Sequence, residues 1–384
     1  MEIPFLNLTR HSHKLFKETS EAVFRVLERG SFILGEEVKS FEAEWARYCE
    51  AKGAVGVANG TEAITLALTA AGVRYGDEVI TTPLTAAYTS LAIVNAGAKP
   101  VFVDIDEKTF NLNPEKIEQS ITPRTRAVVP VHLYGRIAEM EAIAEIAARH
   151  KLPVIEDAAQ AHGARFDGKP CGFSSLAATF SFYPTKNLGA FGDGGAIVSN
   201  DVDFLRKVRA LRQGGHAEAL AMNLTGRNSR LDEMQAAILR VKLKRLDEWT
   251  ARRRELAAIY FERLKNFPRV RLPLAAAESV FHLFVIRHPD RNGLKDFLAE
   301  KGIETLVHYP YLLHEQKIFR SAEQQSLPAA EKVSREILSL PLYPEIENFE
   351  IEAVCKAIEE FENKAAERFI QSGSQENKIK NISE

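Results

Sequence analysis

The sequence has few cysteines, no long apolar run and no excess of charge of either sign. Its three cysteines, Cys49, Cys171 and Cys355, lie far apart, which argues against a disulfide framework or a zinc site and favours a reducing cytoplasm. The 50 basic and 52 acidic residues give a net charge of -2 without a basic stripe, so nucleic acid and anionic membranes are poor candidate partners. No apolar run approaches the roughly 20 residues of a membrane span, and the first residues lack a signal-peptide pattern. We therefore expect a cytoplasmic protein that binds neither nucleic acid nor membrane.

Short apolar runs alternate with helical segments over residues 53–200. The chain has 384 residues, 45% of them hydrophobic, which is enough for two domains with separate cores. Apolar strands separated by helices, such as the amphipathic segment 137–150, are typical of a mainly parallel α/β sheet. Ligands bind such sheets beyond the carboxyl ends of the strands. The predicted strands are 78–83, 100–104, 127–133, 153–157, 179–182 and 196–199.

The C-terminal third predicts a second, smaller α+β domain. A long amphipathic helix from about Leu231 to Phe267 is of the kind that bridges two domains. We expect a large domain over 1–245, a small domain over 246–366 and, because the sequence there is polar and aperiodic, a disordered tail over 367–384. The other predicted elements are strands at 281–286 and near 305–308, and helices at 290–301, 328–337 and 349–366.

A lysine lies between a strand-like run and a glycine-rich turn. Lys186 follows the apolar segment 177–182 and precedes the turn 189–195. A lysine held in a dry site there can lose its proton and condense with a carbonyl group. Most lysines are solvated surface charges, so Lys186 alone identifies no activity.

Three further segments offer groups that such a lysine would need. Gly60 allows close backbone approach, and Thr61 can cap the following helix, whose N–H groups favour an anion; a capped helix without a ligand explains both equally well. Asp157 ends a strand, where it could pair with a cationic ring nitrogen, cap a helix or bind a metal. No residues at metal-ligand spacing support the metal, and we expect none. Ser181 could bind phosphate or bond to the backbone. Together with Lys186 these groups match what pyridoxal phosphate requires: an anchor, a ring-nitrogen partner and a nucleophile.

The chain resembles the DegT/DnrJ/EryC1/StrS group of sugar aminotransferases, pyridoxal-phosphate-dependent enzymes of fold type I. The resemblance extends from about Pro4 to Glu362. It implies an α/β fold in which a large domain with a mostly parallel, seven-stranded type of sheet precedes a smaller α+β domain. The segments that carry it are 35–42, 59–63, 76–80, 131–135, 156–163, 181–195, 228–233, 308–310 and 340–344.

The resemblance also implies roles for individual residues. Lys186 forms the imine with the cofactor, Asp157 pairs with the pyridinium nitrogen, and Gln160 hydrogen-bonds the phenolic oxygen. L-Glutamate donates the amino group and leaves as 2-oxoglutarate, the cofactor passes through pyridoxamine phosphate, and a nucleotide-linked ketosugar accepts the amine. Asn228 reaches the phosphate of the neighbouring subunit, which implies a homodimer with shared sites. The remaining residues are Gly60, Thr61, Glu62 and Ser181 at the phosphate, and Tyr183, His308 and Tyr309 at the sugar.

Two positions bear on the finer assignment. Ala87 falls where the family usually stacks an aromatic ring on the cofactor, and the neighbouring Tyr88 is our candidate for that role. Gln160 stands where some relatives have histidine, which favours amination at C3 of a dTDP-linked 3-keto-6-deoxyhexose over amination at C4.

Other activities stay open. Dehydratase relatives carry histidine at the position of Lys186, so the lysine argues against that reaction. A keto-cyclitol aminotransferase, a 4-keto nucleotide-sugar aminotransferase and a non-catalytic sensor with the same fold all fit the motifs. A Rossmann-type nucleotide-binding protein would need a glycine fingerprint before a helix, whereas the turn 189–195 leads into a predicted strand.

Overall fold

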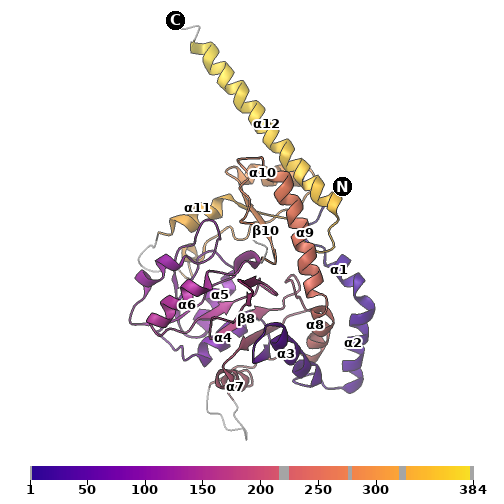
Figure 1. Ribbon diagram of the computed structural model, residues 1–384, viewed down its shortest axis with the longest axis vertical. Helices are drawn as coiled ribbons and strands as arrows, with labels where there is room; N and C mark the ends of the chain where they lie inside the picture. The colour runs from indigo at the N-terminus through magenta and orange to yellow at the C-terminus, as the bar shows by residue number, and fades with distance from the viewer. Residues whose placement is uncertain (1, 216–224, 276–278, 320–325, 381–384) are drawn as a thin grey trace.

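The computed structural model describes residues 2–215, 225–275, 279–319 and 326–380. The chain forms a broad α/β part and, above it in Figure 1, a smaller part that contains the helices from α9 (Leu246–Leu264) to α12 (Asn348–Lys380). Among the described helices, none is long and apolar enough to cross a lipid bilayer. The N-terminal helices are α1 (Leu8–Lys14), α2 (Phe16–Arg29) and α3 (Glu36–Tyr48).

A central sheet organises the larger part. A four-stranded sheet in the order β1-β9-β8-β5 and a three-stranded sheet in the order β3-β2-β4 are joined by the parallel bridges Val128–Val154 and Val131–Asp157. Among the described strands of this sheet, only β9 is antiparallel to its neighbours, so the predicted mainly parallel sheet is confirmed. The strands are β1 (Gly53–Val57), β2 (Glu78–Thr81), β3 (Lys99–Phe102), β4 (Thr125–Val128), β5 (Ile155–Asp157), β8 (Ala177–Ser181) and β9 (Gly195–Ser199), with the hairpin β6 (Arg165–Phe166) and β7 (Lys169–Pro170) beside them.

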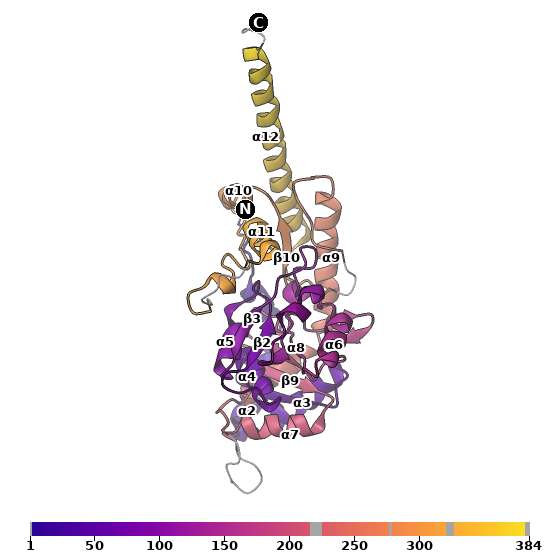
Figure 2. The ribbon, with the colours of Figure 1, turned by 90° about the vertical axis from the view of Figure 1, so that its left-hand side faces the viewer.

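Two helical layers cover the sheet because its strands are apolar on both faces. In β9, Ile197 belongs to the core beneath α4 and α7, whereas Ala196 and Val198 belong to the core beneath α3, α6 and α8. This alternation is the period of two expected of a strand. Figure 2 shows α4 and α5 on one side of the strands and α6 on the other. The flanking helices are α4 (Gly60–Ala70), α5 (Ala87–Asn95), α6 (Met140–Arg149), α7 (Val202–Leu211) and α8 (Glu233–Leu243).

The smaller part contains an antiparallel pair of strands among helices. β10 (Phe284–Arg287) pairs with β11 (Ile337–Leu340), as the α+β prediction requires. The prediction of a strand near 305–308 is wrong, because the described residues form only the single bridge Leu306–Ser339 there. The other helices are α10 (Arg291–Glu300) and α11 (Pro328–Glu336).

The long helix predicted over 231–267 is in fact two helices. α8 ends at Leu243 and α9 begins at Leu246. α8 packs on α2 and α3 of the larger part, whereas α9 packs on α12 of the smaller part. Neither glycine nor proline marks the break, so the helical periodicity alone could not reveal it.

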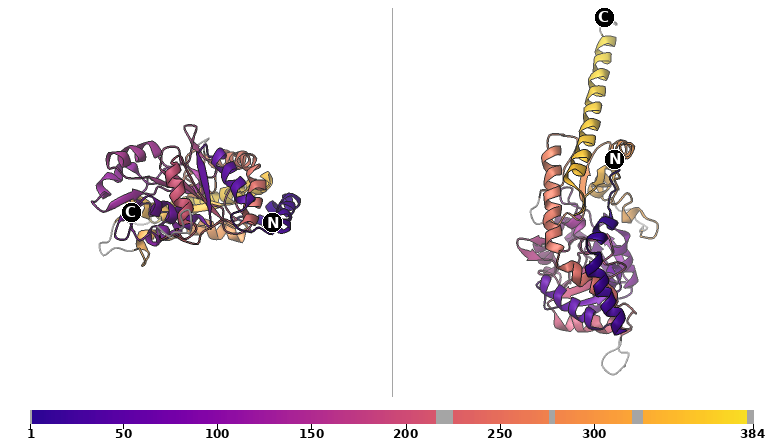
Figure 3. Two further views of the ribbon diagram at one scale, coloured as in Figure 1. Left: turned by 90° about the horizontal axis from the view of Figure 1, so that it is seen from below. Right: turned by 90° about the vertical axis from the view of Figure 1, so that its right-hand side faces the viewer.

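The last helix projects from the molecule. α12 continues as a helix to Lys380, and Figure 3 shows it extending well beyond the smaller part. The sequence predicts a disordered tail over 367–384, a segment that also contains good helix formers such as Glu, Gln and Lys. Residues 381–384 lie outside the described residues, and disorder of the tail stays a prediction.

Candidate active site

The carboxyl ends of two neighbouring strands bring the predicted site residues together. β5 and β8 are parallel and pair Asp157 with Thr179, so Asp157 and Ser181 end their strands at the same edge of the sheet. Lys186 follows in the loop after β8, where its backbone N–H donates to Tyr183 O at 2.9 Å. This is the edge at which open α/β sheets bind their ligands.

Desolvation of its partly buried side chain makes Lys186 unusual among lysines. Desolvation lowers the pKa of its ammonium group to about 8, and the opposing charge of Asp157 offsets part of that shift. At pH 7 roughly a tenth of such amines are unprotonated, compared with well under a thousandth for a lysine in water. Lys186 is therefore available as a nucleophile and as a proton carrier close to neutral pH.

Two donors orient the carboxylate of Asp157, which is 5% exposed. Thr89, in the first turn of α5, donates its hydroxyl hydrogen to Oδ2 at 2.7 Å, and the Ala159 N–H donates to Oδ1 at 3.1 Å. Sequence reasoning missed Thr89, which directly follows the candidate Tyr88. The hydroxyl fixes the carboxylate in a buried position where an unpartnered charge would be costly.

A chain of hydrogen bonds fixes the amide of Gln160. The Tyr134 N–H donates to Gln160 Oε1 at 2.7 Å, so the amide nitrogen faces the other way and donates to the Tyr309 hydroxyl at 3.1 Å. Burial raises the pKa of Tyr309 to about 12, although the Gln160 hydrogen bond opposes that rise. Gln160 from the larger part and Tyr309 from the smaller part are thus in contact, and their roles at the cofactor and the sugar stay predictions.

His308 adjoins this chain of hydrogen bonds. Its Nδ1 lies 2.9 Å from Ser339 Oγ, and its carbonyl accepts a hydrogen bond from the Tyr134 hydroxyl. Burial lowers the pKa of the His308 imidazole to about 4, and the positive charge of Lys186 adds to the shift. His308 therefore lies next to the site through its carbonyl bond to Tyr134 and through its neighbour Tyr309, which contacts Gln160.

The first turn of α4 touches the end of β8. A Cβ atom on Gly60 would lie 2.6 Å from Cβ of Ser181, so only glycine allows this approach without a shift. The helix cap differs from the prediction: Asn59, not Thr61, is the N-cap, and its side chain accepts the Glu62 N–H at 2.9 Å. Because Asn59 caps the helix, the Thr61 hydroxyl is not needed for that role.

Three predicted residues lie at the surface. Tyr88 is 65% exposed and Tyr183 is 52% exposed, and Asn228 is also exposed. Ala87 is partly buried against an apolar cluster that includes Leu84. The stacking role of Tyr88 therefore stays a prediction. Beside Asn228, Arg227 pairs with Glu62 at 3.2 Å, which ties this loop to the start of α4.

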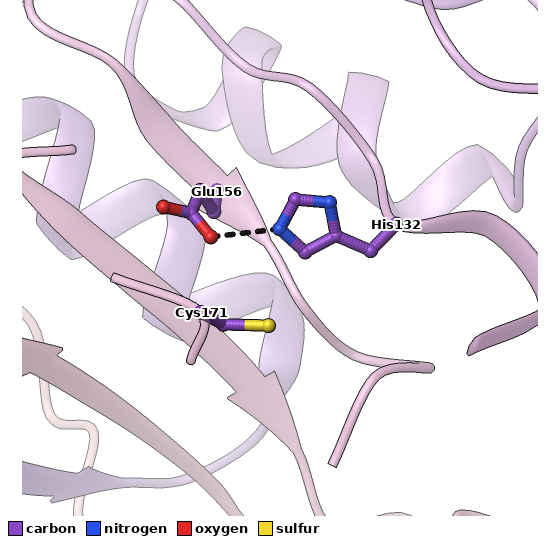
Figure 4. A group of neighbouring side chains, drawn as sticks. All are labelled: His132, Glu156 and Cys171. Carbon is purple, nitrogen blue, oxygen red and sulfur yellow. Dashed lines mark hydrogen bonds and ion pairs between the residues drawn. The ribbon is translucent and has the colours of Figure 1, made fainter. Parts of the chain in front are cut away.

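A second polar cluster includes Glu156, whose side chain lies on the opposite face of β5 from that of Asp157. His132 Nε2 and Glu156 Oε2 are 2.7 Å apart, and Cys171 lies beside them (Figure 4). His132 Nδ1 accepts the Ala138 N–H, so its Nε2 carries the hydrogen donated to Glu156, while Glu156 Oε1 accepts the Gly172 N–H. Burial raises the pKa of the Cys171 thiol. A metal would displace these bonds, and we interpret the cluster as structural.

A protein-family comparison and similar curated proteins connect this geometry to known chemistry. Residues 14–359 match the model of the DegT/DnrJ/EryC1/StrS aminotransferase family. The "pleiotropic regulatory protein" of Geobacillus stearothermophilus is 48% identical over 94% of this chain and 99% of its own. The dTDP-3-amino-3,4,6-trideoxy-alpha-D-glucose transaminase of Streptomyces venezuelae is 45% identical over 94% of this chain and 96% of its own.

Solved structures show the same fold. DesV of S. venezuelae, in complex with a ketimine intermediate, superposes with a TM-score of 0.91 at 45% identity, covering 94% of this chain and 98% of DesV. NtdA of Bacillus subtilis, with bound cofactor PMP, gives a TM-score of 0.90 at 32% identity, covering 94% of this chain and 85% of NtdA.

Proposed function

The chain belongs to the DegT/DnrJ/EryC1/StrS aminotransferase family, and we propose that it transfers the amino group of L-glutamate to the C3 ketone of a dTDP-linked 6-deoxyhexose. The members of this family are pyridoxal-phosphate-dependent enzymes, and the proposal extends that cofactor to this chain. The observation that carries the proposal is Lys186, a partly buried lysine at the sheet edge where Asp157 ends β5, whose pKa desolvation lowers to about 8.

The residues at this edge fit pyridoxal phosphate. Lys186 offers an amine to the aldehyde, Asp157 a carboxylate to the ring nitrogen, and Gln160 an amide N–H to the phenolic oxygen. The close approach of Gly60 to Ser181 forms the cradle for the phosphate, together with Thr61 and the N-terminal turn of α4, although the Glu62 N–H is already used by Asn59. When bound, the cofactor supplies an electron sink for the carbanion formed at the donor carbon.

The chain's own residues then perform the acid–base work. With the cofactor bound, the Lys186 amine would act as the general base that accepts the α-proton of glutamate and then as the general acid that gives a proton back. Asp157 keeps the ring nitrogen protonated, because its oriented carboxylate stabilises the positive charge. In the second half of the cycle Lys186 moves protons in the opposite direction, and the keto sugar leaves as an amino sugar.

The sugar class rests on two supports. The S. venezuelae relative is named for a 3-amino sugar linked to dTDP, and Gln160, which stands where some relatives have histidine, resembles the residue of family members that aminate C3. We place His308, Tyr309 and Tyr183 beside the sugar. Within this proposal the alternatives are a 4-keto nucleotide sugar, a keto-cyclitol and a non-catalytic sensor. The intact pair of Lys186 and Asp157 argues against the sensor.

We further propose a cytoplasmic homodimer with shared sites. The exposed Asn228 is one residue from Arg227, which pairs with the first turn of α4. A second copy placed against this surface would receive Asn228 at its phosphate and would cover the exposed Tyr88 and Tyr183. The N-terminal phenylalanines Phe16 and Phe24, 69% and 60% exposed, offer further apolar surface for such a contact.

A spectroscopic titration tests the proposed function. The purified protein, loaded with pyridoxal phosphate, should lose its yellow absorbance when L-glutamate is added and regain it with 2-oxoglutarate. The amino sugar dTDP-3-amino-3,4,6-trideoxy-α-D-glucose should bleach it too, because transamination runs in both directions. Bleaching by glutamate without a response to the amino sugar would overturn the sugar class, and no response to any amino donor would favour the sensor.

A further inference from the structure

Tyr134 contacts both halves of the site through different groups. It lies in the short 3₁₀ turn Leu133–Gly135, where its φ of 59° places the backbone in the left-handed region. Its N–H donates to Gln160 Oε1 at 2.7 Å, on the cofactor side. Its hydroxyl donates to the carbonyl of His308, in the segment of the smaller part proposed to face the sugar.

The tyrosine is well fixed for this contact. Its side chain is buried among apolar residues and lies edge-on to Phe110, with ring centroids 5.7 Å apart. Burial, together with the nearby Tyr309, raises the pKa of the Tyr134 hydroxyl well above its ordinary value, so the group stays protonated and can donate. The side chain of His308 is held separately, by Ser339 at 2.9 Å, and that bond belongs entirely to the smaller part.

We propose that Tyr134 is a positioning residue that fixes the His308–Tyr309 segment against the cofactor side of the site. The inference rests on the proposed function and deepens it, because it names a residue that serves one of the two half-reactions more than the other. Removing the hydroxyl frees the His308 carbonyl but leaves the backbone bond to Gln160 in place. The sugar, which we place against His308 and Tyr309, should therefore feel the change more strongly than glutamate.

The variant Tyr134→Phe tests this against a matched control. Tyr260 is also fully buried and donates its hydroxyl to a backbone carbonyl, that of Pro341 at 2.9 Å, but it lies away from the site in the core of the smaller part. Tyr260→Phe therefore removes a bond of the same kind. For both variants the bleaching of the cofactor-loaded protein is measured with L-glutamate and with dTDP-3-amino-3,4,6-trideoxy-α-D-glucose.

The expected result is selective. Loss of one hydrogen bond should raise the KM for the amino sugar about tenfold in Tyr134→Phe, with glutamate kinetics within about twofold of wild type. Tyr260→Phe should leave both the KM for the amino sugar and the glutamate kinetics at their wild-type values. Equal losses with both donors, or no loss with either, would overturn the inference.

Hydrogen exchange decides the inference without any sugar. Amide exchange in the segment 304–312 should rise severalfold in Tyr134→Phe and stay unchanged in Tyr260→Phe. Unchanged exchange there would refute the positioning role. If wild-type protein responds to glutamate but ignores the amino sugar, the proposed sugar class fails, while the exchange measurement still decides the role of Tyr134.

Discussion

The hydroxyl of Thr89 lies 2.7 Å from Oδ2 of Asp157 and donates a hydrogen bond to it from the first turn of α5. The two residues are 68 positions apart in the chain, and Asp157 ends β5. This contact fixes the carboxylate that we assign to the ring nitrogen of the cofactor. It makes Thr89 a positioning residue for Asp157, although no motif identified it.

Replacing Thr89 should weaken the function of Asp157 without removing it. Thr89→Val keeps the shape but removes the donor, and we expect kcat to fall about tenfold, the cost of one hydrogen bond to a charged group. Thr89→Ser retains the hydroxyl and should stay close to wild type. Steady-state kinetics with glutamate on the three proteins provides the measurement, and equal kcat values for valine and serine would refute the positioning role.

Cofactor uptake should depend on pH through Lys186. Since burial lowers the pKa of Lys186 to about 8, its neutral, nucleophilic form grows as pH rises through that value. The rate at which cofactor-free protein turns yellow with pyridoxal phosphate should therefore increase from pH 6 and level off above about pH 9. A rate that keeps rising past pH 10, as for a lysine in water, would contradict the buried site.

The approach of α4 to β8 should be sensitive to one methyl group. Gly60→Ala would place a Cβ atom 2.6 Å from Ser181 Cβ, so one of the two segments must shift. We expect the Kd for pyridoxal phosphate, measured by fluorescence quenching, to rise at least tenfold, by analogy with overpacking of a tight contact. Gly60→Ala should bind pyridoxal, which lacks the phosphate, about as well as wild type does. A similar loss of affinity for both ligands would show that the substitution disturbs a part of the site other than the phosphate cradle.

Shared sites predict complementation between two inactive variants. Lys186→Ala lacks the amine, and Asn228→Asp would bring a negative charge to the neighbouring subunit's phosphate. If Asn228 serves the site of the partner, about half of the dimers in a random mixture are mixed, and each mixed dimer has one intact site of two. Activity should then reach roughly a quarter of wild type. If Asn228 serves its own subunit, no mixed dimer has an intact site. Activity that stays at the level of the separate variants would then refute sharing.

The convergence of Lys186, Asp157 and Ser181 could be predicted because Asp157 and Ser181 end neighbouring apolar strands and Lys186 follows the second of these strands in the chain. Strand alternation is local, and the end of a strand fixes where the next residue lies. The resemblance alone implies roles for Gln160 and Tyr309; the structure brings their side chains within 3.1 Å of each other, and the roles stay predictions.

Other features depend on contacts that local sequence does not encode. Thr89 acts on a residue far along the chain, and Tyr134 reaches Gln160 through its backbone, which carries no side-chain signal. From the sequence Thr61 can cap α4, since threonine and asparagine are both good caps, and only the backbone path selects Asn59. The break between α8 and α9 arises because α8 packs on the larger part and α9 packs on the smaller part.

The most direct test of the central claim is to locate the lysine that binds the cofactor. Lys242 is an internal competitor, because burial lowers its pKa to about 8 as well, but its amine donates to the Gly189 carbonyl and lies over the Phe191 ring at 5.1 Å. The protein is loaded with pyridoxal phosphate, reduced with borohydride and digested, and the modified peptide is identified by mass spectrometry. We predict the label on Lys186 in one-to-one amount with the chain; a label on Lys242, or none, would contradict the account.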